Sequence, residues 1–187
     1  GRKRPAKAER LFVGVFIAPD EANKITPVGE ALRREHQIAE RLIAADRYHI
    51  SLEHLGDYRR IKSPIVYAAG KAGSRVSFAE FEVTFNRAGS FNTPPPKVGP
   101  HKRPFVLLAE PGLVSELRGN LAAELAKYNI RSSSHFVPHL TLTYSQKFVP
   151  FRDIEPITIT VNQFALVHSR RGLTEYIFFE RWMLNAA

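Results

Sequence analysis

One order of elements occurs twice in this chain of 187 residues: a strand, a long helix, and a second strand that carries a histidine. In the first half, a β-branched and aromatic run predicts a strand over 10–18, an apolar stripe predicts a helix from about 27 to 45, and a histidine-bearing strand is expected over 47–55. The corresponding segments of the second half are 105–109, about 111–128 and 137–144. The repetition indicates an internal duplication, although the two halves share too little sequence to prove one.

The remaining segments place the chain in the α+β class. A short helix is expected over 63–72, and further strands are expected over 80–85, 156–167 and 175–182. Pro27 suits the first turn of the first long helix, with Thr26 as its cap. Together these elements predict mainly antiparallel sheets backed by helices, and a hydrophobic content of 44% is ample for a packed interior.

Composition limits the partners and the compartment. The formal net charge of +9 favours attraction to nucleic acid, but part of the excess lies in 1–9, which is expected to be a flexible basic arm ahead of one domain over 10–187. A solubilising tail is the alternative interpretation of that arm. Because no apolar run approaches the roughly 20 residues that cross a bilayer and no secretory signal is recognisable, a cytoplasmic protein without membrane contact is expected. The lack of cysteine excludes disulfides, thiolate nucleophiles and Cys-based zinc sites.

Two tetrapeptides in the histidine-bearing strands follow one pattern of histidine, apolar residue, hydroxyl residue and apolar residue. The first runs from His49 to Leu52 and the second from His139 to Leu142. Because side chains alternate across a strand, His49 and Ser51 are expected on one face, and His139 and Thr141 on the equivalent face. If the two strands lie side by side, two imidazoles and two hydroxyls converge on one small space.

This set of side chains suits the chemistry of phosphate esters. A neutral imidazole can take a proton from water and a protonated one can give a proton to a departing sugar oxygen, each role contributing roughly 10²–10⁴-fold in rate. The histidine pKa of about 6.5 lies near working pH. The hydroxyls of Ser51 and Thr141 can donate hydrogen bonds to phosphate oxygens as negative charge builds there. A strained cyclic phosphate needs no metal for such a step, and neither a metal-ligand spacing nor a cofactor motif is evident.

These motifs resemble those of the 2H phosphoesterase superfamily, and more closely those of the RNA 2′,3′-cyclic phosphodiesterases, also called 2′-5′ RNA ligases. The similarity runs from residue 11 to residue 184. Besides the two motifs, the segments that carry it are Arg10-Leu11-Phe12, the continuation of the first motif to Gly56, the segment 164–169, Gly172 and Tyr176.

The resemblance implies a bilobal fold with pseudo-twofold symmetry, built from two antiparallel sheets with helices outside. It implies hydrolysis of a terminal 2′,3′-cyclic phosphate to a 2′-phosphate end, on RNA ends or nucleotide substrates, by a protein expected to be a monomer. By analogy, His49 would protonate the departing 3′ oxygen and His139 would activate water; the residue spacing alone assigns neither role.

Three residues depart from the family pattern. Ser51 replaces the commoner threonine and keeps the hydroxyl. His54 stands where a phenylalanine is common and is expected to face the core, away from the site. Tyr144 stands where relatives often carry an arginine that holds phosphate, so the positive charge is expected from elsewhere, with three candidates in this sequence: Arg170, Arg171 and Lys147.

Two other functions remain open at this stage. A reversible RNA ligase that forms 2′-5′ linkages would use the same residues, because an acid–base pair works in both directions. A non-catalytic RNA-binding module is the other alternative, although such a module has no reason to keep both histidines and both hydroxyls. Phe12 and Phe16 could stack a base but are expected in the core.

Overall fold

The computed structural model describes residues 5–186, and the expected α+β class is confirmed there. Within these residues the elements follow one another as β1 (Glu9–Phe16), α1 (Pro19–His36), the short 3-10 helix η1 (Ala45–Arg47), β2 (His49–Tyr58), α2 (Ser63–Ser74), β3 (Phe81–Ser90), β4 (Arg103–Ala109), α3 (Leu113–Ala126), β5 (His139–Ser145), β6 (Arg152–Val161), β7 (Gln163–Arg170) and β8 (Glu175–Met183). The expected succession of strand, long helix and histidine strand therefore occurs twice, as β1-α1-β2 and β4-α3-β5.

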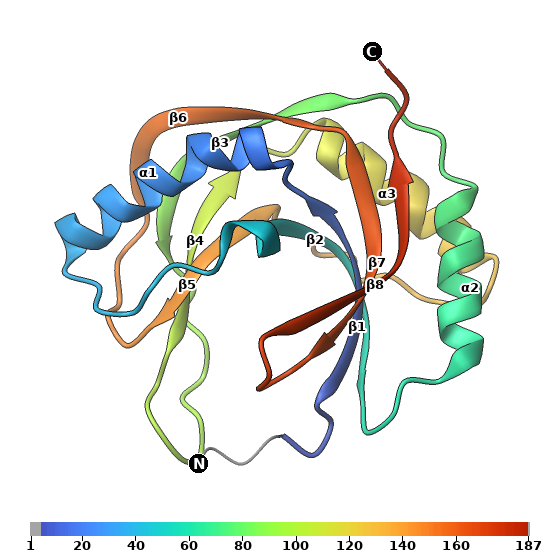
Figure 1. The fold of residues 1–187 in the computed structure, drawn as a ribbon, viewed down its shortest axis with the longest axis horizontal. Helices are drawn as coiled ribbons and strands as arrows, with labels where there is room; N and C mark the ends of the chain where they lie inside the picture. Colours follow the sequence, from blue (N-terminus) through green and yellow to red (C-terminus); the bar gives the residue numbers. More distant parts are fainter. Residues whose placement is uncertain (1–4, 187) are drawn as a thin grey trace.

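The eight strands form one antiparallel sheet in the order β6-β3-β4-β5-β2-β1-β7-β8. This order is symmetrical about its centre, where the two histidine strands β5 and β2 meet, each flanked by the strand that precedes its long helix. The two halves are joined by a single residue pair, Ile50 with Leu140, at equivalent positions of the two motifs. The two sheets expected from the sequence are thus two four-stranded halves of one curved sheet (Figure 1).

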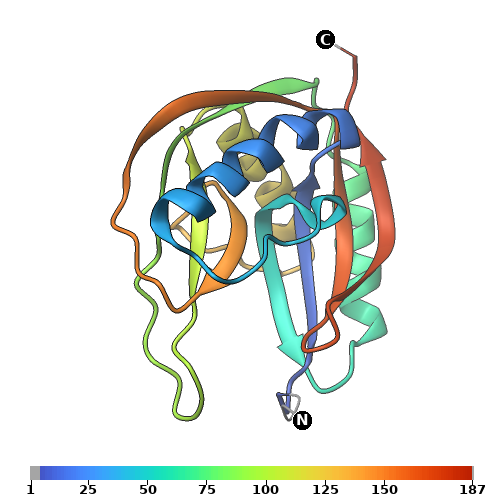
Figure 2. The same cartoon turned by 60° about the vertical axis from the view of Figure 1, so that its left-hand side comes forward.

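The helices cover one face of this sheet and enclose the main core. Helix α1 contacts β6 (Figures 1 and 2). Helix α2 packs against α3, β7 and β8, and α3 also contacts β2 in one half of the sheet and β3 in the other. Alternate residues of β1, such as Leu11 and Val13, are fully buried in the same core as Leu117 and Leu121 of α3. A second, smaller cluster of Phe12, Phe16, Ala165 and Val167 lies on the other face of β1 and β7.

Helix α1 begins and ends earlier than the sequence pattern predicts. It starts at Pro19, whose fixed φ suits a first turn, and the acidic side chains of Asp20 and Glu21 complement the helix dipole there. Pro27 lies inside the helix rather than at its start. Gln37, in the left-handed conformation with φ of 57°, ends the helix well before residue 45.

The error over the end of α1 has a packing cause. Leu42 and Ile43 continue the apolar spacing of the helix, but they pack against the core from the irregular segment that follows it. Thr26, expected as a cap, instead places its hydroxyl 2.9 Å from the hydroxyl of buried Tyr48. Apolar residues at helical spacing therefore reach the core here without forming a helix, which is why the pattern predicted a helix that is too long.

The segment 156–167 forms two strands where one was expected. Strand β6 ends at Val161 and β7 starts at Gln163, yet β6 lies at one edge of the sheet and β7 lies beside β1 in the other half. The alternation of apolar and polar residues changes phase at the break, because Asn162 and Gln163 are both polar and the apolar residues resume at Phe164. This change of phase is the signal in the sequence that separates the two strands. Asn162 is the point at which the chain passes from one half of the sheet to the other.

The ends of the chain and its helices bear on two further expectations. Residues 1–4 of the expected basic arm lie outside the described residues, and Glu9 already belongs to β1. Within residues 5–186, each helix is too short or too polar to cross a lipid bilayer.

Helix α2 offers a matched pair of glycines that tests its packing. A Cβ at Gly73 would lie 2.3 Å from the ring of Trp182, which is itself packed 4.8 Å from the ring of Phe164, whereas a Cβ at Gly70 meets nothing closer than 3.9 Å. Gly73→Ala is expected to lower the free energy of unfolding by about 1–3 kcal/mol through overpacking. Gly70→Ala is expected to raise it by about 0.5–1 kcal/mol, because alanine loses less backbone entropy in a helix. Urea denaturation measures both values, and equal effects would contradict this packing.

Candidate active site

The junction of β2 and β5 brings the two histidine motifs together. Because Ile50 pairs with Leu140 in an antiparallel register, His49 lies opposite Thr141 and Ser51 lies opposite His139. The apolar members of both motifs, including Ile50 and Leu140, are fully buried in the core. The two histidines and two hydroxyl residues therefore share the other face of the sheet, at the axis of its symmetry.

Both imidazole rings are oriented by the same hydrogen bond. The Nδ1 atom of His49 lies 2.8 Å from the carbonyl oxygen of Arg47, and the Nδ1 atom of His139 lies 2.8 Å from the carbonyl oxygen of Val137. A carbonyl oxygen can only accept, so Nδ1 carries the proton in each ring. In each ring, Nε2 is left without a hydrogen-bond partner within residues 5–186, and is free to exchange a proton with a substrate.

Aromatic side chains enclose His49. The ring of Phe16 stacks on the imidazole at 5.1 Å between centroids, Phe12 lies at 4.9 Å, and Tyr176 meets it edge-on at 5.8 Å. Phe12 and Phe16 are 4% and 3% exposed, so the expectation that they pack in a core is confirmed. Gly14 lies between them, where a Cβ would come within 3.4 Å of the imidazole, and its lack of a side chain leaves room for the ring. The site face of β1 thus fixes the plane of His49.

Burial weakens the basicity of both histidines. Burial, followed by repulsion from His139 and Arg47, lowers the pKa of His49 to about 4, although the hydrogen bond to the carbonyl of Arg47 acts in the opposite direction. Burial likewise lowers the pKa of His139, which also meets the ring of Phe91 edge-on at 4.8 Å. Both imidazoles are therefore neutral in the free protein at pH 7, as a proton acceptor must be.

A basic cleft of about 870 Å³ adjoins the histidines. Tyr176, which touches His49, and Tyr144, which follows Thr141 in β5, both line it. Its other lining residues come from the proline-rich loop around 94–102, from the segment 40–47, from β1 and β5, and from the end of β7 and the turn that follows it. Its cations are Arg10, Arg41, Arg47, Lys102, Arg170 and Arg171. Glu40 is the acidic side chain among them, so the cleft favours an anionic ligand.

Tyr144 reaches this cleft because β5 contains a bulge. Phe105 of β4 pairs with Thr143, but the next residue, Val106, pairs with Thr141, so Leu142 is an extra residue in β5. Strict alternation would point Tyr144 toward the core with Leu142. The bulge restores Tyr144 to the face of the histidines, where its side chain is 50% exposed.

A similar bulge makes the expectation for His54 wrong. In the pairing of β1 with β2, Val13 faces Glu53 and Gly14 faces Ser51, so Leu52 is the extra residue. His54, expected on the core side, therefore lies on the histidine face with its side chain 55% exposed, 3.8 Å from Asp57. Glu53 takes the buried position instead, 3.6 Å from the guanidinium of Arg118.

Arg170 and Arg171, two of the three cations suggested as replacements for the missing arginine, line the cleft but are already ion-paired. Arg171 lies 3.4 Å from Asp57, which Arg10 also binds with two nitrogens at 2.8 and 3.1 Å. Arg170 pairs with Glu175 at 3.2 Å and with Glu9 at 4.0 Å. Lys147 is not among the residues that line the cleft.

Arg47 is a candidate that the sequence pattern did not single out. Its guanidinium lies 5.6 Å from the centre of the Tyr176 ring and has no carboxylate partner within residues 5–186. Its charge is close enough to His49 to lower the pKa of that imidazole. The available signal was its position two residues before the motif histidine, in the segment that turns into β2.

No constellation of three or more histidine, aspartate or glutamate side chains within residues 5–186 is placed to hold a metal ion.

Comparison with known proteins places the fold. No protein-family model matches the sequence, and no curated protein matches it. Among solved structures, a phosphoesterase is 24% identical with a TM-score of 0.68, covering 95% of this chain and 99% of its own. LigT of E. coli, solved in complex with 3′-AMP, is 24% identical with a TM-score of 0.66, covering 95% and 98%. The protein TT0787 of Thermus thermophilus is 22% identical with a TM-score of 0.68, covering 95% and 98%. Over nearly its whole length, the chain therefore has the same fold as LigT and TT0787.

Proposed function

We propose that this protein hydrolyses the 2′,3′-cyclic phosphate at RNA ends to a 2′-phosphate, with His49 and His139 exchanging the protons. The observation that carries the proposal is the pairing of two identically oriented imidazoles with two hydroxyls at the β2–β5 junction. An RNA end fits the basic cleft beside them, because each added nucleotide brings a further phosphate. The complexes of LigT with phosphate and with 3′-AMP are consistent with a nucleotide ligand in this fold.

The proposed reaction needs one imidazole in each protonation state. The neutral ring takes a proton from water as the water oxygen bonds to phosphorus, and the protonated ring gives a proton to the 3′ oxygen as its bond to phosphorus breaks. Ser51 and Thr141 donate hydrogen bonds to the non-bridging oxygens. Both rings are neutral in the free protein at pH 7, so one gains its proton with the anionic substrate; the resemblance assigns that ring to His49 and water activation to His139.

A direct assay tests the proposal and separates it from its alternatives. The protein is incubated with an oligoribonucleotide ending in a 2′,3′-cyclic phosphate, with a metal chelator present, and the product end is identified. Release of a 2′-phosphate end is the expected result. If no turnover is seen, the hypothesis of a non-catalytic RNA-binding module is favoured, and joined oligonucleotides would indicate a ligase. Loss of turnover with the chelator would overturn the metal-free mechanism.

Arg47 is proposed to bind the phosphate in place of the arginine that Tyr144 replaces. Arg47→Ala is expected to lower kcat/KM about 10–100-fold, because a hydrogen bond to a charged group contributes about 1.5–3 kcal/mol. The substitution spares the main-chain carbonyl that orients His49. Steady-state kinetics on the cyclic substrate measures the effect.

Two variants serve as controls for Arg47→Ala. Arg47→Lys keeps the charge and is expected to recover part of the loss. Arg131→Ala removes an equal charge from an exposed position outside the cleft and should leave kcat/KM unchanged. Equal losses in Arg47→Ala and Arg131→Ala would mean that net charge alone is responsible.

A further inference from the structure

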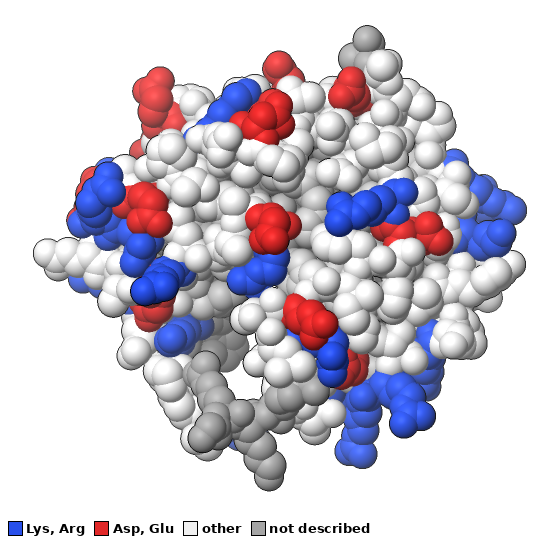
Figure 3. All heavy atoms as spheres, viewed as in Figure 1, with Lys and Arg blue, Asp and Glu red and all other residues white. Residues whose placement is uncertain are grey.

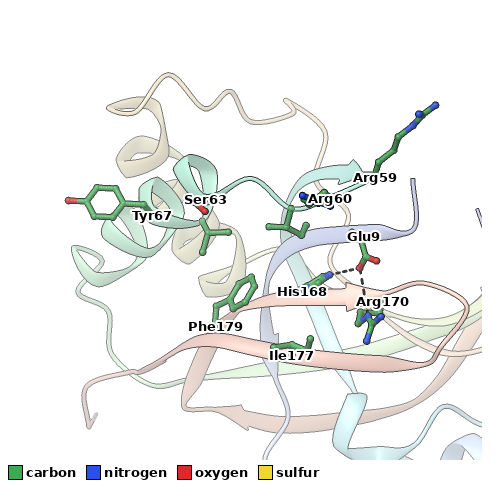
Figure 4. A pocket seen from close by; sticks show the side chains of 11 residues that line it. Glu9, Arg59, Arg60, Ser63, Tyr67, His168, Arg170, Ile177 and Phe179 are labelled. Carbon is green, nitrogen blue, oxygen red and sulfur yellow. Dashed lines mark hydrogen bonds and ion pairs between the residues drawn. The ribbon is translucent and has the colours of Figure 1, made fainter. Parts of the chain in front are cut away.

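A second cleft, of about 820 Å³, opens on the reverse face of the sheet. It lies between the start of α2 and strands β1, β7 and β8 (Figure 4). In β7, Ala165 and Val167 belong to the small cluster on the histidine face, whereas Phe164 and Leu166 belong to the main core. His168 continues the second series, so the cleft that it lines is separated from the histidine site by the sheet itself.

The floor of this reverse-face cleft is apolar and partly open to solvent. Phe179 and Ile177 of β8 line it with exposures of 38% and 36%, and Val66 of α2 and Ile61 lie among the same lining residues. Large apolar side chains gathered in one concave patch are typical of a ligand-binding site, whereas single exposed ones are ordinary. The floor continues along α2, because Val66, Tyr67 and Phe179 also line a neighbouring hollow of about 490 Å³.

The acidic side chain of the cleft is already paired with two of its neighbours. The carboxylate of Glu9 lies 2.5 Å from Nε2 of His168 and 4.0 Å from Arg170, and the side chains of Glu9 and His168 are 16% and 14% exposed. Figure 4 shows this polar group at one end of the cleft, opposite Phe179. The mostly buried carboxylate of Glu9 is therefore engaged at one end of the cleft, away from its apolar part.

The free charge at the rim is positive. Arg59 and Arg60, in the connection between β2 and α2, have no carboxylate partner within residues 5–186. Figure 4 shows Arg60 beside the cleft, whereas Arg59 extends away from it. Basic side chains also gather in Figure 3 at the lower right, where Figure 1 places this connection.

We propose that this cleft binds a small amphipathic anion, with its apolar body on Phe179, Ile177 and Val66 and its acidic group on Arg60. The volume of about 820 Å³ lies within the range of roughly 300–1,000 Å³ that drug-sized ligands occupy. The cationic rim disfavours a neutral or cationic ligand of the same shape. The site does not depend on the histidine chemistry, because the sheet lies between them.

The test uses 1-anilinonaphthalene-8-sulfonate, an aromatic sulfonate whose fluorescence rises on binding, as the probe. One saturable site is expected per native chain. Phe179→Asp replaces part of the apolar floor with a charge that repels the sulfonate, and Arg60→Glu replaces the cation with an anion. Each variant is therefore expected to weaken binding of the probe at least about tenfold. Arg60→Lys should retain most of the affinity. Near-UV circular dichroism confirms that each variant keeps its tertiary packing.

The chain offers matched controls for both variants. Phe148→Asp places the same charge at a phenylalanine of similar exposure, 45%, outside this cleft, and Arg75→Glu reverses an exposed arginine elsewhere. Neither should change the affinity, and His139→Gln should bind the probe normally even where turnover is lost. Unchanged affinity in Phe179→Asp would overturn the location. Equal affinity for the uncharged analogue N-phenyl-1-naphthylamine would overturn the preference for an anion.

Discussion

His49→Gln and His139→Gln are each expected to lower kcat for a 2′,3′-cyclic phosphate by about 10²–10⁴-fold, the contribution of one positioned acid or base. In the proposed reaction each imidazole supplies one proton transfer, and glutamine supplies none. The double variant should lose little more than the worse single variant, because groups that act as a unit are not additive. Similar losses in the two single variants, with little further loss in the double variant, are expected because the β2–β5 junction places both rings in one site.

Stability must be separated from catalysis in these variants. Both rings lie on the face of the sheet opposite the main core, so the thermal midpoint should stay within a few degrees of the wild-type value. His135→Gln is a suitable control, since His135 is exposed and lies outside the β2–β5 junction. Full activity in either His49→Gln or His139→Gln would refute the assignment of that ring, whereas a loss equal in His135→Gln would indicate a nonspecific effect.

The pH dependence is expected to be bell-shaped, with its maximum in kcat/KM on the acid side of pH 6.5. The pKa of His49 is lowered to about 4 and that of His139 is lowered by burial, so the free protein loses its protons at lower pH than ordinary histidines. Above both pKa values the fraction with one protonated ring falls about tenfold per pH unit. Below about pH 4 both rings are protonated and no base remains.

Initial rates at low substrate concentration between pH 4 and 9 measure this profile, after subtraction of the uncatalysed reaction. The alkaline limb of kcat should lie at higher pH than that of kcat/KM, because a bound phosphate anion favours the protonated ring. Proton NMR titration of the imidazoles in His49→Gln and His139→Gln assigns the limbs to residues. A flat kcat/KM from about pH 5 to 9 would contradict two titrating histidines.

Much of the fold and the centre of the site follow from local patterns in the sequence. The strand-helix-strand order occurs twice, which predicted that the two histidine strands occupy equivalent places in the two halves of the sheet, and they do. Alternation placed His49 with Ser51 and His139 with Thr141, on the face opposite buried Ile50 and Leu140. Such features are predictable because side chains alternate between the two faces along any stretch of strand that contains no bulge.

The rest was decided by contacts between distant segments. The bulges at Leu52 and Leu142 are defined by the pairing of β2 with β1 and of β5 with β4, and they turn His54 and Tyr144 toward the face of the histidines. The place of Arg47 beside the site depends on its contact with Tyr176, which comes from the far end of the chain. The early end of α1 depends on a core that Leu42 and Ile43 reach from an irregular segment.

The sequence by itself therefore determined which side chains are candidates for the proposed chemistry and that they share a face. The tertiary structure decided what surrounds them: the aromatic enclosure that lowers the pKa of His49, the cations of the cleft, and a second cleft behind the sheet. The physical reason is that alternation is a property of a single strand, whereas register, burial and electrostatic neighbours exist only after strands distant in sequence have paired.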